Sequence, residues 1–205
     1  MKKVCELGRS MVEMLGVLAI IGVLSVGGIA GYSKAMEKYR LNKHAESFNM
    51  LLNASLQYSA QLKGSGYKNT ENTTEYYAET LKHLNAIPDG IKYVSRDTLK
   101  DIYDNAIVVF SNNSGDFGMA LLFGDNKGNE QVCANYIKTA KENHSELKRV
   151  YMQQFSGGTH TSGIGIMYGD KYCDKNKSCL RNLTLENIST LCNSCIDDCT
   201  LYIVW

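Results

Sequence analysis

The most prominent pattern in the sequence is an uninterrupted apolar run near the N-terminus. From Met14 to Tyr32 no residue carries a charge, and a helix of that length spans roughly 28 Å, close to the hydrocarbon thickness of a bilayer. Beyond the run, apolar residues recur at near-helical spacing up to Gly64, with polar residues between them: Leu41, Ala45, Phe48, Leu52, Leu56 and Leu62. The pattern predicts one helix of about 80 Å, membrane-spanning over residues 9–32 and amphipathic over residues 33–63.

The pattern changes in residues 64–205, which predict a globular head. Helices are expected over 75–85 and 134–154, and a glycine-rich loop over 157–163. Strands are expected in four short apolar stretches bounded by turn residues: Ala106–Phe110, Phe117–Phe123, Ile164–Tyr168 and Thr200–Trp205. Short turns between strands imply an antiparallel sheet. The expected class is α+β, with the long helix packed on the sheet.

The overall charge is close to balanced. Twenty-two basic and twenty-one acidic residues leave a net charge of +1. The chain therefore has no global field that attracts polyanions, which excludes a strongly basic nucleic-acid binder.

The residues ahead of the apolar run form a recognisable signal. A short basic leader ends at Gly8, Arg9 follows, and Glu13 directly precedes the apolar stretch. This arrangement resembles the processing signal of type IV pilins and pseudopilins, over roughly residues 1–40. The resemblance implies that a prepilin peptidase cuts after Gly8 and methylates the new N-terminus at Arg9. Two positions depart from the family pattern, since the first mature residue is usually apolar and a proline is usual where Ala30 stands.

Glu13 has a physical interpretation of its own. A carboxylate at the edge of a bilayer core is costly unless it is paired. Cleavage after Gly8 would create an α-amine at Arg9, four residues away and on the same helix face, so a pair within one chain is one possibility. The resemblance implies that Glu13 pairs instead with the amine of a neighbouring subunit during assembly. We expect the second role.

Together these features predict a structural subunit of a type IV pilus-like filament rather than an enzyme, with no cofactor or metal. The precursor is expected as a single-pass protein of the bacterial inner membrane, and the assembled filament as extracellular or periplasmic. Expected partners are further copies of the chain, minor pilins and the prepilin peptidase. A pseudopilin of type II secretion is an alternative with the same N-terminus.

A different class of protein remains open. Gly28-Ile29-Ala30 is a small-x-small triplet after an apolar core, which is also typical of a secretory signal. In that case a soluble, disulfide-rich domain would begin at Gly31. The alternative function is that of a membrane-tethered or secreted disulfide-rich domain with thiol-redox activity. The uninterrupted helical pattern past Ala30 favours the membrane helix.

The cysteines indicate an oxidising compartment. Cys5 lies in the leader, and the other six are expected to form structural disulfides: Cys133, Cys173, Cys179, Cys192, Cys195 and Cys199. The short spacing of Cys173 and Cys179 favours a local bridge. Cys133 is expected to pair within the segment Cys192–Cys199, with its partner left open. The resulting loop of about 60 residues resembles the disulfide-bounded C-terminal region of many pilins.

The cysteine spacing also suggests two other uses, a thiol-redox motif and a zinc site. Cys192-x-x-Cys195 has the spacing of a thiol-redox motif, but it follows a predicted helix, whose dipole there raises thiol pKa. A zinc site from this pair with Cys173 and Cys179 would need an unusually wide first spacing. His160 lies in a glycine-rich stretch predicted as solvated loop, without a partner that would indicate catalysis.

Overall fold

The computed structural model describes residues 11–68, 74–124 and 129–205. The chain divides into two compact units, one ending at Arg40 and the other extending over Leu41–Trp205. The second unit holds the sheet and every buried core residue of the described part.

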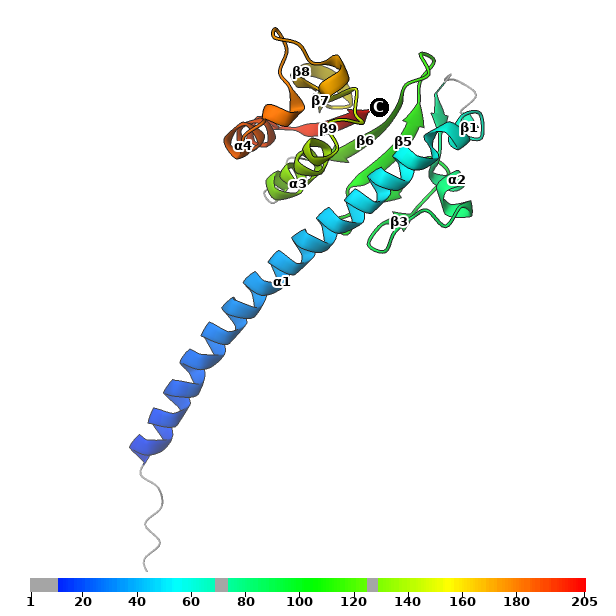
Figure 1. Cartoon of the computed structure of the whole chain (residues 1–205). Coiled ribbons are helices and arrows are strands. Elements are labelled where there is room, and N and C mark those ends of the chain that lie inside the picture. The colour runs from blue at the N-terminus through cyan, green and yellow to red at the C-terminus, as the bar shows by residue number, and fades with distance from the viewer. Residues whose placement is uncertain (1–10, 69–73, 125–128) are drawn as a thin grey trace, which may run out of the picture. The chain divides into compact units, whose positions relative to one another are not determined.

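A single long helix runs through the N-terminal part of the chain. This helix, α1 (Met11–Leu62), is coloured blue to cyan in Figure 1. It contains no proline, since the chain's one proline is Pro88, so nothing in its sequence interrupts the helical hydrogen bonds. It ends where Gly64 adopts a left-handed φ of 80° and the Ser65 amide bonds the Leu62 carbonyl. The predicted long apolar helix is confirmed.

A nine-stranded sheet forms the centre of the head (Figure 1). Its main path runs β1-β2-β5-β6-β9-β7-β8, while β4 joins β3 to β5. Every pair of named strands is antiparallel, which confirms that expectation. The strands are β1 (Tyr67–Lys68), β2 (Glu75–Tyr76), β3 (Lys92–Tyr93), β4 (Leu99–Lys100), β5 (Ala106–Ser111), β6 (Phe117–Phe123), β7 (Arg149–Ser156), β8 (Thr159–Tyr168) and β9 (Asp198–Val204).

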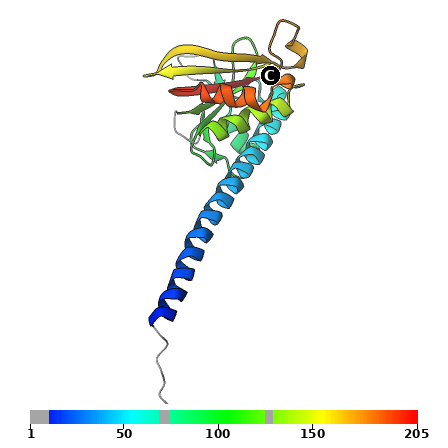
Figure 2. The same ribbon diagram turned by 90° about the vertical axis from the view of Figure 1, so that its left-hand side faces the viewer.

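Helices accompany the sheet on one side. α3 (Asn129–Glu142) lies beside the C-terminal half of α1 (Figures 1 and 2), and the Phe48 and Tyr136 rings meet edge-to-face at 4.6 Å. α4 (Leu185–Asn193) starts with a capping box formed by Thr184 and Asn187. The remaining helical segments are α2 (Ala78–His83) and two short 3-10 helices, η1 (Asp170–Tyr172) and η2 (Leu180–Asn182).

Alternation along the strands separates a buried face from an open one. Ile107 and Val109 of β5 point into the core with Leu121 and Met119, their partners on β6. These side chains join one cluster with residues of α1 and α3: Phe48, Leu51, Leu52, Tyr136 and Ile137. The opposite face of the sheet carries side chains that are half-buried or exposed: Val108, Phe110, Leu122, Tyr151 and Tyr202. The chain is thus an α+β protein with an open sheet face.

The prediction of a helix over 134–154 is wrong in its second half. The chain forms α3 over Asn129–Glu142 and then strand β7 over Arg149–Ser156. β7 pairs with both β8 and β9. Its alternate residues Val150 and Met152 point into the core. This alternation has the period of a strand rather than that of a helix.

The structure also differs from the predictions for two shorter segments. The glycine-rich loop over 157–163 is instead a two-residue turn at Gly157 and Gly158, with φ of 57° and 81°, and the rest continues in β8. Left-handed φ at both positions is the geometry of a tight hairpin turn, for which glycine is favoured. The helix expected over 75–85 is strand β2 followed by the shorter α2.

Candidate functional site

The N-terminal half of α1 exposes its apolar side chains. Ten large apolar residues between Met14 and Ile29 are 52–74% exposed. Exposure of this extent around a whole helix is unfavourable in water and calls for lipid or protein cover. Within the described residues, α1 is the helix long and apolar enough to cross a membrane, a property that a secretory signal sequence shares.

Glu13 lies in the first turn of α1 and is exposed. A carboxylate in this position interacts favourably with the positive end of the helix dipole. Gly8 and Arg9 lie outside the described residues, as does Cys5. The cleavage site and the pairing of Glu13 with the amine of Arg9 therefore stay predictions.

All six cysteines of the C-terminal half form disulfides. Cys133 of α3 bonds Cys192 of α4 across a sequence separation of 59, which ties the two helices together. Two local bonds join Cys173 to Cys179 and Cys195 to Cys199. The pairing follows the expected scheme and identifies Cys192 as the partner of Cys133.

The same pairing removes the basis of the thiol-redox and zinc alternatives. Cys192 and Cys195 belong to different disulfides, so they do not form a Cys-x-x-Cys pair. The sulfurs proposed as zinc ligands are likewise used in disulfides. Across residues 11–68, 74–124 and 129–205, no group of three or more His, Cys, Asp or Glu residues could hold a metal ion.

A buried polar group lies where α1, α3 and the turn after β4 meet, and we call it the Asp101 cluster: His44, Asp101, Asn105 and Tyr136. The Asp101 Oδ2 atom accepts hydrogen bonds from His44 Nε2 at 3.0 Å, Tyr136 OH at 2.5 Å and Asn105 Nδ2 at 3.0 Å. Its Oδ1 atom accepts from the backbone amides of Tyr103 at 2.8 Å and Asn105 at 2.9 Å. Five donors thus converge on one carboxylate.

The electrostatics of the cluster follow from this convergence. Burial acts to raise the pKa of the Asp101 carboxyl, but the hydrogen bonds from His44, Tyr136 and Asn105 outweigh it and hold that pKa below its ordinary value. The same burial, with the negative charge of Asp101 beside it, raises the pKa of the Tyr136 hydroxyl well above its ordinary value. The cluster therefore holds an ionised carboxylate against a neutral phenol inside the core.

No contiguous motif marks this cluster in the sequence, and it was not predicted, although one signal is present. His44 lies three residues after Leu41 and four before Phe48, on the face that the apolar spacing assigned to the core. A histidine there needs a partner, and Asp101 supplies it. Of the other histidines, His144 pairs with an aspartate at 2.9 Å, and His160 is exposed on β8, in a strand rather than the predicted loop.

Comparison of the chain with protein-family models, with curated proteins and with solved structures finds no match.

Proposed function

We propose that this chain is the precursor of a type IV pilin-like filament subunit, held in the bacterial inner membrane until its leader is removed. Assembly then proceeds through the apolar half of α1, and the head forms the body of each subunit. The chain has a structural role in this proposal. Other copies, minor pilins and the prepilin peptidase are its partners.

One observation carries the proposal: a single continuous helix has two different surfaces. Up to Ile29 its large apolar side chains are exposed, whereas Phe48, Leu51 and Leu52 further along are fully buried in the head. The exposed half needs an environment that the chain itself does not supply. A bilayer before assembly and neighbouring helices afterwards would both provide it.

The glycines of the exposed half support close helix contact. A Cβ added at any of five positions would meet no described atom within 4 Å: Gly16, Gly22, Gly27, Gly28 and Gly31. Each glycine weakens a helix by about 1 kcal/mol relative to alanine, and no packing against the described part of the chain requires it. Small residues spaced four apart, such as Gly27 and Gly31, allow two helices to approach closely.

Leader processing tests the identity of the precursor. The full chain is expressed in a bacterium that has a prepilin peptidase, and the N-terminal mass of the product is measured. We expect a product that begins at Arg9, and we expect Gly8→Val to abolish processing because the peptidase of the family needs a small residue before the cut. A product that begins at Gly31 would identify a secreted domain instead.

Filament formation tests the role of Glu13. Glu13→Gln is expected to leave processing intact and to reduce the yield of sheared filaments strongly, because the buried amine loses its counter-charge. Glu37→Gln is the matched control, since Glu37 is an exposed carboxylate of the same helix beyond the apolar run. Equal filament yield from both variants would contradict the role of Glu13. Short periplasmic assemblies in place of surface filaments would favour the type II secretion pseudopilin.

A further inference from the structure

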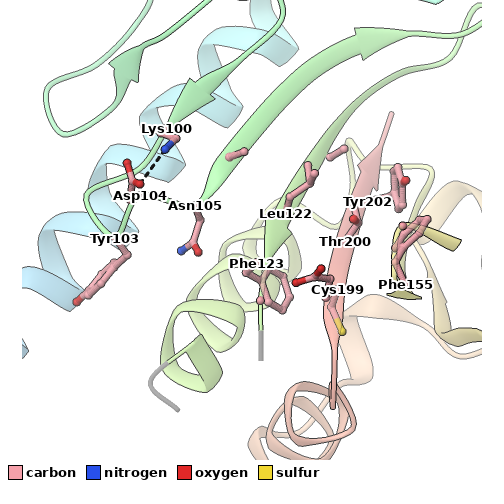
Figure 3. A pocket seen from close by; sticks show the side chains of 15 residues that line it. Lys100, Tyr103, Asp104, Asn105, Leu122, Phe123, Phe155, Cys199, Thr200 and Tyr202 are labelled. Atoms are coloured by element: carbon pink, nitrogen blue, oxygen red, sulfur yellow. Dashed lines mark hydrogen bonds and ion pairs between the residues drawn. The ribbon is translucent and has the colours of Figure 1, made fainter. Parts of the chain in front are cut away.

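The open face of the sheet contains a hollow of about 730 Å³ (Figure 3). Its floor includes Ala106 on β5 and Ala120 on β6, two small side chains on the outward face. Larger side chains surround these two alanines, including those of Leu122 and Tyr202. A hollow of this volume lies within the range of small-molecule sites.

One wall of the hollow is aromatic. Tyr202 of β9 and Phe155 of β7 lie on the same side of the cavity in Figure 3. The Tyr202 ring stacks on Tyr151 at 4.7 Å with an interplanar angle of 10°, which fixes its position. Leu122 is 41% exposed next to them. This wall can accept an apolar body of a ligand.

The opposite rim is a turn fixed by the Asp101 cluster. The Asp101 carboxylate bonds the amides of Tyr103 and Asn105, the residues on either side of Asp104. Asp104 has a left-handed φ of 68°, and its carboxylate pairs with Lys100 Nζ at 2.7 Å. The rim is therefore held in place, and the positive charge of Lys100 is already balanced.

Among the described residues, the remaining charge at the hollow is negative. The described lining includes one cation, Lys100, and two carboxylates, Asp104 and Asp198. Asp198 begins β9 opposite Phe155, and strand alternation sends its side chain to the same face as Tyr202. No described cation lies within ion-pair distance of Asp198. A positively charged ligand would compensate this carboxylate, and an anion would be repelled.

We propose that the hollow binds a small organic cation, an amine or ammonium group carried on an apolar body, with the Asp198 carboxylate as its counter-charge. Aromatic rings next to the charged group add to the attraction, because the ring faces are electron-rich. The apolar body would lie over Ala106 and Ala120. The inference is independent of filament assembly, since all of its residues belong to the head.

Titration calorimetry of the full chain in a non-ionic detergent tests the proposal, with benzylamine as the probe. We expect a dissociation constant of about 1 mM that weakens as salt is raised to about 0.5 M. Benzyl alcohol has the same apolar body without the charge, and we expect it to bind about fivefold more weakly.

Two variants show whether binding depends on the carboxylate at the hollow or on exposed carboxylates in general. Asp198→Asn is expected to weaken benzylamine binding about fivefold, whereas Asp197→Asn, an exposed carboxylate next in sequence that does not line the hollow, should bind as the unaltered chain does. The second variant also corrects for uptake of the probe by detergent. Ala106→Leu, which fills part of the floor, should weaken binding of both probes.

Other results would overturn the proposal. Equal binding of benzylamine by Asp198→Asn and Asp197→Asn would remove the role of the carboxylate. Tighter binding of benzyl alcohol than of benzylamine would make the hollow a neutral apolar site. Binding of methyl glucoside in preference to benzylamine would assign it to sugars.

Discussion

His44 and Asp101 are separated by 57 positions in the sequence, and their side chains meet at 3.0 Å in the core of the head. An ionised carboxylate has no proton to donate, so His44 Nε2 is the donor. The bond joins α1 directly to the turn that leads into β5. A polar contact therefore reinforces the attachment of the helix to the sheet, alongside the apolar packing of Phe48 and Leu52.

Replacing the carboxylate by an amide should destabilise the head. Asn at position 101 would turn one acceptor oxygen into an NH₂ donor, so at least two of the five converging donors would lose their acceptor. We expect Asp101→Asn to lower the free energy of unfolding by about 3 kcal/mol, measured by urea unfolding of the full chain in detergent. Asp89→Asn, at an exposed position, is the control. A loss no larger than that of the control would show that the cluster contributes little.

The depressed pKa of Asp101 predicts a pH dependence. Its stabilising contribution is fully present above the pKa of an unfolded Asp, about 3.9, and is lost as the pH falls through the lower pKa of the folded state. Stability of the unaltered chain should therefore rise with pH across the acid range, and Asp101→Asn should flatten that rise. Urea unfolding at several acid pH values measures the slope. Asp89→Asn should keep the slope of the unaltered chain, and an unchanged slope in Asp101→Asn would contradict the assignment.

The long-range disulfide and the local Cys173–Cys179 disulfide should differ in their contributions to stability. In the chain-entropy description, the long loop closed by Cys133–Cys192 is worth about 4 kcal/mol and the short loop closed by Cys173–Cys179 about 2 kcal/mol. Replacing both cysteines of each pair by alanine tests the order, with urea midpoints as the measurement. The buried position of Cys133 and Cys192 should widen the gap through lost packing. A larger loss of stability from removing Cys173–Cys179 than from removing Cys133–Cys192 would mean that the entropy of the unfolded chain is not the main source of disulfide stabilisation.

Charges placed in the apolar half of α1 should impair membrane association. Val23 and Leu24 lie near the middle of the run and are 74% and 69% exposed. Arginine at both positions is expected to cost about 6 kcal/mol of insertion free energy, so that most of the full-length chain no longer sediments with membranes after alkaline washing. The control replaces Met36 and Tyr39, which are also exposed apolar residues of α1 but lie beyond the run. Loss of both variants from the membrane would argue for a general folding defect instead.

Local patterns in the sequence predicted much of the fold. The extent of α1, the strands β5 and β6 and the Cys173–Cys179 bond depend on residues close in sequence, so periodicity and spacing were sufficient. Strand β7 was not predicted, although its apolar residues alternate and one partner, β8, follows it directly in the chain. Its place between two strands depends on β9, which comes much later. Local preference alone does not decide between helix and strand in such a segment.

The candidate sites also divide into those that depend on neighbouring residues and those that depend on residues far apart in the sequence. The apolar run and Glu13 are contiguous in sequence, and they could be identified without a structure. The Asp101 cluster joins residues from three separate segments, and the hollow on the open face depends on two small residues, Ala106 and Ala120, that lie diagonally across β5 and β6. Neither arrangement leaves a contiguous motif, so only the fold brings these residues together.

The positions of the disulfides have a mechanical consequence. All three bonds of the described part lie between Cys133 and Cys199, and α1 contains no cysteine. If a filament of these subunits were stretched, no disulfide would link α1 to the sheet, and its tension would be carried by packing, hydrogen bonds and the peptide backbone after Leu62. The segment between Leu62 and Cys133 could then unravel and lengthen by roughly 3.4 Å per residue, whereas the loop held by Cys133–Cys192 could not extend. Each subunit would therefore unfold first in its N-terminal strands. This partial unfolding would absorb the mechanical energy, while the cross-linked C-terminal part stayed folded.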